Sequence, residues 1–212
     1  MTHEINCTRL EELNLEISYV TSKIVRIKFD SVFPGRYKVP IQKKFNLPSS
    51  SEHSSETKMY NIELNDSNAS IIIQRNDIPI TLINTTIGGM IFCDKYLQFS
   101  TYLPENTDYY GFGENYRRMF RHDPDYRTFP LFSRNRKVID GDTNGFGQHP
   151  FMMGVHADGK AFGLFFLNSN AMGLFVFNFC IISKISDNIF VVRSLHILTS
   201  SCIVNENDRW NN

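Results

Sequence analysis

The sequence predicts an all-β fold in which two layers of antiparallel strands form a β-sandwich. Three observations support this prediction. Apolar and polar residues alternate with a period of two along several short segments, turn residues separate these segments, and no segment shows the 3.6-residue period of an amphipathic helix. With 212 residues, of which 42% are hydrophobic and 13% aromatic, the chain is long and apolar enough to bury a core.

The first predicted strands lie near the N-terminus. Between Leu13 and Tyr19 the odd-numbered residues are apolar and the even-numbered ones polar, and the pattern recurs at Val25, Ile27 and Phe29. An antiparallel strand with this pattern buries one face and leaves the other in water. The polar run SSSEHSSE at 49–56 follows, and its low complexity predicts an exposed loop.

Denser apolar runs predict the central strands. IIIQ at 71–74 and FGLFFL at 162–167 are apolar on both faces, as in strands that are covered on both sides. Alternation at 78–82 predicts another half-buried strand. Proline and glycine turn signals separate the strands, at Pro34–Gly35, Pro104, Asp140–Gly141 and Asp158–Gly159.

One apolar stretch has the length of a membrane span. Residues 161–183 contain no charged side chain and exceed the threshold of about 18 residues for a transmembrane helix. The polar sequence NSN interrupts this stretch at 168–170, and the apolar runs on either side have the length of strands. We therefore predict two buried strands joined by a polar turn and no membrane span.

Charge and cysteine usage exclude several classes of function. Lys+Arg and Asp+Glu both total 22, whereas a nucleic-acid-binding protein needs a basic surplus, so nucleic acid is not an expected partner. The four cysteines are widely spaced and form no CxxC pair, which argues against a zinc site and leaves disulfides open. The first twenty residues show no signal-peptide pattern, so the sequence leaves the cellular location open.

Candidate catalytic groups gather in YGFGENYRRMFRHD at 110–123. Two glycines without the third of a nucleotide loop predict a β-turn or bulge rather than a phosphate site. Glu114 and Asp123 are a conceivable glycosidase-like pair, but the neighbouring arginines favour structural ion pairs of Glu114 with Arg117, Arg118 or Arg121.

The histidines and the long polar loop complete the candidate sites. His122, His149 and His156 do not have the spacing of a common metal site, and we predict structural roles for them, with no metal and no cofactor. The polar loop within residues 132–150 is rich in Arg, Asn, Asp and Gly, which are suitable partners for sugar hydroxyls, and the alternative is a solvated loop without a binding role.

Four motifs in fixed order resemble one family. They are FCDKYLQFSTYLPENTDYYGFGENYRRMFRHD, YRTFPLFSRN, GDTNGFGQHPFMMGV and GLFFLNSNAM. They resemble the N-terminal β-sandwich of glycoside hydrolase family 31, and most of all its animal α-glucosidase branch of sucrase-isomaltase, maltase-glucoamylase and lysosomal acid α-glucosidase. The resemblance implies a galactose-mutarotase-like supersandwich over residues 1–172. Residues 173–212 diverge, and we interpret them as a truncated tail or the product of an incorrect intron boundary.

The resemblance also implies a function. Family members are retaining exo-α-glucosidases whose two catalytic carboxylates lie on a (β/α)8 barrel that follows the sandwich. We find neither barrel repeats nor the family's nucleophile motif in this sequence, so we expect no catalytic residues here. The prediction is the N-terminal domain of an α-glucosidase that hydrolyses terminal α-linked glucose from maltose-like oligosaccharides, inactive alone. The alternative is a stand-alone carbohydrate-binding module.

Two residues correspond to a substrate-contacting pair of the family. In the family an Arg-Asp pair on a loop of this domain shapes the sugar pocket, and Arg134 and Asn135 stand at the matching positions. An amide in place of the carboxylate retains hydrogen bonding but loses the charge-assisted acceptor. The resemblance thus implies Arg134 and Asn135 as substrate-binding residues, with oligosaccharide bound only in the context of a full-length enzyme. Family members are lysosomal, secreted or on the cell surface.

Overall fold

A computed structural model gives the fold of most of the chain. It describes residues 13–32, 57–67, 70–87, 91–92, 97–116, 119–122, 127–133, 144–168, 171–177, 180–185 and 194–200. In this part the regular structure is β-strand apart from one 3-10 turn, η1 (Thr85–Ile87). The predicted all-β class is confirmed.

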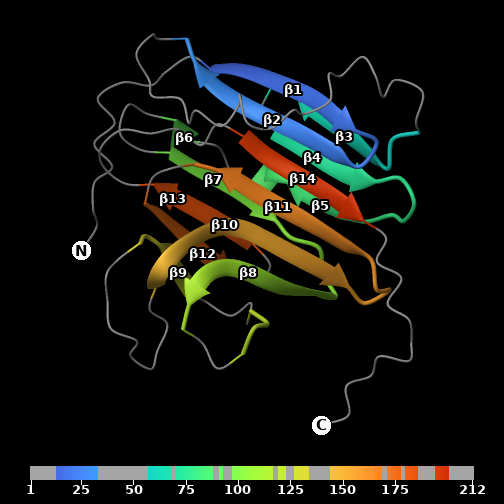
Figure 1. Cartoon of the computed structure of the whole chain (residues 1–212). Helices are drawn as coiled ribbons and strands as arrows, with labels where there is room; N and C mark the ends of the chain where they lie inside the picture. The colour runs from blue at the N-terminus through green and yellow to red at the C-terminus, as the bar shows by residue number, and fades with distance from the viewer. Residues whose placement is uncertain are drawn as a thin grey trace.

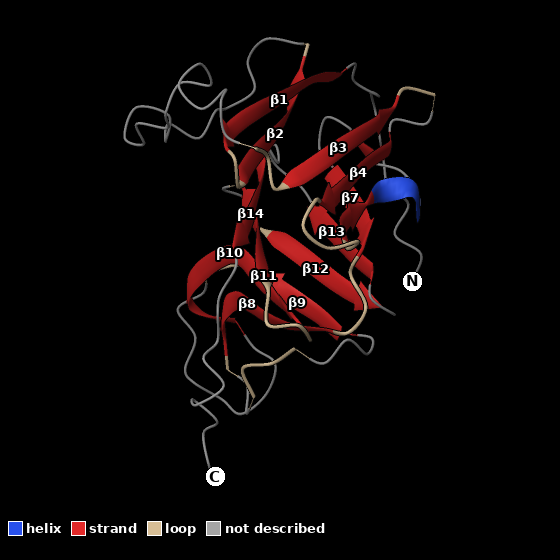
Figure 2. Cartoon of the chain, turned by 90° about the vertical axis from the view of Figure 1, so that its right-hand side faces the viewer, coloured by secondary structure: helices blue, strands red, loops and turns tan. Residues whose placement is uncertain are grey.

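Two sheets lie face to face, as Figure 2 shows from the side. In the described residues the first sheet has six strands, in the order β1 (Leu13–Thr21), β2 (Ile24–Ser31), β14 (Ser194–Ser200), β11 (Ala161–Leu167), β10 (Asn144–His156) and β8 (Thr107–Asn115). Every neighbouring pair in this sheet is antiparallel. Figure 1 shows this sheet in front of the other, with β1 and β8 at its two edges.

The second sheet is also antiparallel. Its order is β3 (Tyr60–Asn65), β4 (Ser70–Arg75), β5 (Thr81–Asn84), β7 (Leu97–Tyr102), β13 (Cys180–Ile185), β12 (Met172–Phe177) and β9 (Arg127–Leu131). The two-residue strand β6 (Ile91–Phe92) pairs with β7 outside this path. The strands β13 and β14, from the segment 173–212, therefore occupy interior positions, one in each sheet.

The core fills the space between the sheets with apolar side chains from both. Phe166 of β11 contacts Phe99 of β7 edge to face, with ring centroids 6.2 Å apart, and Phe112 of β8 lies 6.1 Å from Phe166. Such aromatic pairs add stabilisation to the apolar area that they bury. The core also contains β-branched residues of β2, β4 and β5, namely Val25, Ile27, Ile71, Ile73 and Ile83.

A tyrosine connects the two sheets between β3 and the turn that joins β1 to β2. Tyr60 of β3 is buried, and its hydroxyl donates to the backbone carbonyls of Thr21 and Ile24, at 3.2 and 3.1 Å. Burial raises the pKa of this hydroxyl to about 12, so it stays a neutral donor. The ring of Tyr19 stacks on Tyr60 with centroids 6.2 Å apart.

The alternating segments near the N-terminus form strands, with one difference from expectation. Val25, Ile27 and Phe29 of β2 are buried as predicted. In β1, however, Leu15 and Tyr19 are 43% and 39% exposed, although their pattern predicts burial. The reason is position, because β1 is an edge strand and the described part of the second sheet covers it incompletely.

The predicted central strands are confirmed, whereas the strand predicted at 78–82 is partly wrong. β4 and β11 lie inside their sheets, and most of their side chains are buried. β5 begins only at Thr81, because Arg75 and Ile80 close a turn through a 2.9 Å backbone hydrogen bond and Ile78 lies within it.

The apolar stretch at 161–183 forms strands. It contains β11, then β12, and then most of β13, and polar residues separate β11 from β12 as predicted. Within the described residues, no helix has the length and apolar character needed to cross a membrane.

Candidate functional site

The loop predicted to contact sugar connects β9 to β10. Because β9 belongs to the second sheet and β10 to the first, the loop passes from one sheet to the other. Arg134 and Asn135 lie outside the described residues. Before the gap, Leu131 is fully buried while Phe132 and Ser133 are exposed, and after it Asn144 pairs with Asn115 of β8. The flanking residues are thus held in strand pairs, Leu131 with Met172 and Asn144 with Asn115.

Glu114 anchors the far end of this loop. Its Oε2 accepts a hydrogen bond from the backbone amide of Gly147, at 2.7 Å. A side chain at Gly145 would meet the same carboxylate oxygen at 2.6 Å, so the absence of a Cβ there lets β10 approach Glu114. The prediction of a structural role for Glu114 is confirmed, with a backbone amide as its described partner.

Of the three arginines expected as alternative partners of Glu114, Arg121 alone lies within the described residues, and it does not pair with Glu114. The guanidinium of Arg121 instead contacts Asp108, with Nη1 3.2 Å from Oδ1, and both side chains are more than half exposed. The other two arginines, Arg117 and Arg118, lie outside the described residues. So does Asp123, the second carboxylate of the conceivable glycosidase-like pair. The described contacts therefore give Glu114 a backbone partner, and its pairing with Arg117, Arg118 or Asp123 stays a prediction.

The glycine-rich segment forms a bulged strand, as predicted. The register between β8 and β10 shifts twice, between Asn144 and His149 and again between His149 and Met152. Gly111 has a φ of +105°, and a Cβ there would collide with the backbone carbonyl of Phe151. The next residue, Phe112, has a φ of +51° while its ring is buried in the core. Backbone geometry thus explains this part of the motif.

His122 attaches the segment after β8 to the sheet. The residue is buried, its Nε2 lies 2.6 Å from the carbonyl oxygen of Gly111, and its backbone amide donates to the carbonyl of Tyr109 at 2.7 Å. The prediction of a structural histidine is confirmed here. In the same segment Met119 and Phe120 are exposed, and the Phe120 side chain is 94% exposed.

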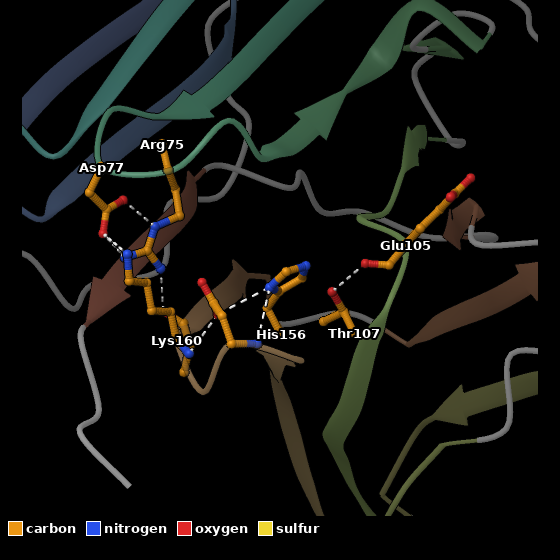
Figure 3. A network of polar contacts seen from close by, with 8 residues as sticks. Arg75, Asp77, Glu105, Thr107, His156 and Lys160 are labelled. Carbon is orange, nitrogen blue, oxygen red and sulfur yellow. Dashed lines mark hydrogen bonds and ion pairs between the residues drawn. The ribbon is translucent and has the colours of Figure 1, made fainter.

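A charged network lies at the opposite end of β10 (Figure 3). Arg75 donates from Nε and Nη2 to the two carboxylate oxygens of Asp77, both at 2.8 Å, and from Nη1 to the carbonyl of Ala161, at 3.2 Å. Lys160 Nζ lies 3.1 Å from Asp77 Oδ2. Because Arg75 belongs to the second sheet and Ala161 to the first, this network joins the two sheets.

Burial of Arg75 makes its ion pair with Asp77 important for stability. The Arg75 side chain is only 2% exposed, so its charge depends on the bidentate carboxylate for compensation. The hydrogen bond from Arg75, and then that from Lys160, hold the pKa of Asp77 well below its usual range. Sequence reasoning missed this network because Arg75 and Ala161 are 86 residues apart and no local pattern links them.

His156 belongs to the same end of the sandwich. Its Nδ1 lies 3.0 Å from Oδ1 of Asp158, which also accepts from the backbone amide of Lys160 at 3.0 Å. The backbone amide, followed by His156, lowers the pKa of Asp158. His156 is the last residue of β10 and not a loop residue as predicted, and its contact with Asp158 agrees with the predicted structural role.

The described residues contain no group of three or more metal-ligating side chains. His149 is exposed on β10, opposite Gly113 in the register, and the side chains of all four cysteines lie outside the described residues. The polar geometry in this part of the chain is therefore that of strand anchoring and sheet-to-sheet contact.

Comparisons with known proteins agree with this geometry. The family model for the glycosyl hydrolase 31 N-terminal galactose mutarotase-like domain matches residues 14–173. Intestinal sucrase-isomaltase of Homo sapiens is 38% identical over 157 residues, covering 71% of this chain and 8% of that protein. Lysosomal α-glucosidase of Mus musculus is 31% identical over 160 residues, covering 76% of this chain and 16% of that protein.

Solved structures share the fold. A GH31 dextranase of Flavobacterium johnsoniae, complexed with glucose, superposes with a TM-score of 0.64 at 12% identity, covering 92% of this chain and 26% of that one. The chain spans less than a fifth of the length of the curated relatives named here. The match over residues 14–173, together with the two-sheet architecture, shows that the chain belongs to glycosyl hydrolase family 31 through its N-terminal galactose mutarotase-like domain.

Proposed function

We propose that this chain acts as the N-terminal domain of an α-glucosidase that releases terminal α-linked glucose from maltose-like oligosaccharides, and that it is inactive alone. The family match over residues 14–173 is the observation that carries the proposal. Three of the described carboxylates, those of Glu114, Asp77 and Asp158, have structural partners, which favours a supporting rather than a catalytic role for these groups. In this proposal the bond-breaking carboxylates belong to a barrel that follows the domain.

Exposed apolar side chains support a role in contacting such a barrel. They occur in the segment after β8, directly after β9 and in the first part of β10, at Met119, Phe120, Phe132 and Phe146. Exposed apolar groups of this size mark contact surfaces when they gather on one side of a molecule. The hydrogen bonds of His122 to β8 and of Glu114 to β10 fix two of these segments. We propose that they pack against the catalytic barrel.

The loop between β9 and β10 has the second role in this proposal. Its fixed ends at Leu131 and Asn144 would present Arg134 and Asn135 toward the sugar at the barrel mouth. Asn135 would accept and donate hydrogen bonds to hydroxyls through its amide, without the stronger acceptor that a carboxylate provides.

A hydrolysis assay tests the proposal. The purified chain is incubated with maltose and with a chromogenic α-glucoside, beside a full-length family 31 α-glucosidase as the positive control. We expect glucose release by the control and none above the blank by this chain. Turnover by the chain that increases with protein concentration and survives repurification would overturn the proposal.

A further inference from the structure

We propose that a pocket where β5, the β7–β8 turn and the end of β10 meet binds a neutral pyranose unit of a saccharide. Its lining residues do not include Arg134 and Asn135. The pocket has a volume of about 330 Å³, at the lower end of the range of about 300–1,000 Å³ for small-molecule sites. Ten residues line it: Pro79, Ile80, Thr81, Asn84, Tyr102, Leu103, Pro104, Glu105, Asn106 and His156.

Tyr102 gives the pocket an aromatic surface. It is the last residue of β7, and its side chain is 44% exposed although its backbone pairs with Asn84 and Cys180. A tyrosine in this position presents an apolar ring face together with a hydroxyl. The C–H face of a pyranose packs on such a ring while its hydroxyls remain available, and Pro79 and Ile80 extend the apolar wall.

Polar groups with free hydrogen-bonding capacity surround this ring. In the described part of the chain, no hydrogen bond or ion pair engages the Glu105 carboxylate, the Asn106 amide or Nε2 of His156. Asn84 uses Oδ1 to accept from Thr86, which leaves its Nδ2 as a donor. Planar amides, a carboxylate and an imidazole supply both donors and acceptors for neighbouring sugar hydroxyls.

The turn that carries two of these groups is fixed by three hydrogen bonds to its backbone carbonyls. Tyr109 Oη donates to Pro104 at 2.6 Å, Thr107 Oγ1 to Glu105 at 3.0 Å, and the Ala157 amide to Asn106 at 3.0 Å. Figure 3 shows the contact between Thr107 and Glu105 beside His156, with the Glu105 carboxylate directed away from the network. Since these hydrogen bonds already fix the backbone of the turn, ligand binding there has to order side chains but not the backbone.

The backbone of Asn106 gives independent support for a binding role. Its φ of +52° lies in the left-handed region, which asparagine tolerates better than most residues but which still stores strain. The hydrogen bond from Ala157 to its carbonyl holds this conformation. Strained residues that the surrounding structure holds in place cluster at ligand sites, and Asn106 lines this pocket.

Charge selects a neutral ligand. The Glu105 carboxylate lines the pocket, and Asp158 lies behind His156 at 3.0 Å. Two nearby negative groups disfavour phosphates and sugar acids, whereas neutral hydroxyls gain a strong acceptor. The ligand class is therefore a neutral hexose unit, as in maltose.

Titration of the isotope-labelled full chain with maltose, followed by NMR amide shifts, tests this inference. We expect saturable shifts at Tyr102, Glu105, Asn106 and His156, and affinity at least tenfold weaker in Tyr102→Ala. Tyr102→Trp retains the aromatic face and should bind within about threefold of wild type. Glu105→Gln removes the charged acceptor and should weaken maltose binding several-fold, and it keeps the inference testable if Tyr102→Ala does not fold.

Tyr19→Ala is the matched control, because Tyr19 is similarly exposed but lies on β1, and its maltose affinity should be unchanged. Glucuronate should bind more weakly than glucose. The inference is overturned by the absence of saturable binding, by shifts confined to 132–147, or by unchanged affinity in folded Tyr102→Ala or Glu105→Gln.

The binding test and the hydrolysis test fail independently. Binding at Tyr102 is compatible with a domain of a larger enzyme and with a stand-alone carbohydrate-binding module. Absence of maltose binding therefore removes this site while leaving the proposed role of the domain intact, and hydrolysis by the chain removes the proposed role while leaving this site intact.

Discussion

The two ends of β10 are held to their surroundings by different interactions. At its C-terminal end the strand leads into the network of Arg75, Asp77 and Lys160, in which a buried guanidinium charge joins the sheets. At its N-terminal end it meets Glu114 through the amide of Gly147 and follows a bulged register beside β8. The first end depends on charge compensation, and the second depends on space for the backbone.

This difference determines which changes each end tolerates. A buried charge is costly when its partner is removed, because it cannot regain the hydration it had in water. A close backbone approach is costly when a Cβ is added, because a backbone carbonyl cannot move aside as a flexible side chain can. Three experiments examine this contrast, from the largest expected effect to the smallest.

Asp77→Asn should have the largest effect. The substitution leaves the 2% exposed Arg75 side chain without a charged partner, and we expect the free energy of unfolding to fall by about 3 kcal/mol. Urea denaturation followed by circular dichroism measures this change. Asp108→Asn is the control, since it breaks an Arg-Asp pair in which both side chains are more than half exposed, and it should cost less than about 1 kcal/mol. Equal losses in the two variants would show that burial does not decide the difference.

Acid should weaken the same end. The pKa of Asp77 lies below its ordinary value of 3.8 in the folded chain, so the unfolded chain binds the proton first as pH falls. The contribution of Asp77 is complete above pH 3.8 and is lost as pH falls through its folded-state pKa. Between about pH 5 and pH 2 the wild type should therefore lose about 2 kcal/mol more than Asp77→Asn, measured by urea denaturation at each pH. Parallel pH profiles of the two proteins would contradict the assignment.

A comparison of two glycines with positive φ, Gly111 at the bulge and Gly159 in the turn after β10, gives the smallest expected effect. Gly111→Ala and Gly159→Ala both place a side chain in the left-handed region, with φ of +105° and +82°. Only at Gly111 does the new Cβ also collide with a carbonyl, that of Phe151, because the space around Gly159 is open. We expect Gly111→Ala to lower the free energy of unfolding by about 1 to 2 kcal/mol more than Gly159→Ala. A difference near zero in thermal or urea unfolding would mean that the bulge moves to accept the methyl group.

The alternation of apolar and polar residues predicted side-chain burial correctly in an interior strand but not in an edge strand. Alternation at Val25, Ile27 and Phe29 led correctly to a buried face, because β2 lies inside its sheet. The same pattern in β1 overestimated burial at Leu15 and Tyr19, because an edge strand has a paired neighbour on one side only.

The turn before β5 shows another limit of pattern. The apolar residues at 78–80 read as strand, but Arg75 binds Asp77 and Ile80 closes back on Arg75, so the chain turns there. Alternation does not distinguish an extended segment from a turn whose ends are joined by a backbone hydrogen bond. Neither the network around Arg75 nor the pocket could be predicted from the sequence. Their residues come from distant segments that only the packing of the sheets brings together.

The sequence by itself determined the fold class and the family. Alternation, turn residues and motifs in a fixed order can all be read from the amino-acid sequence without knowing which segments meet in space. The sequence also indicated that the glycine-rich segment and His122 have structural roles, and the hydrogen bond from His122 to the backbone carbonyl of Gly111 agrees with this prediction. Only the tertiary structure decided which charges meet. Arg75, Asp77 and Lys160 become a single unit, and Tyr102, Glu105, Asn106 and His156 line one pocket, because packing two sheets face to face joins residues that the chain keeps far apart.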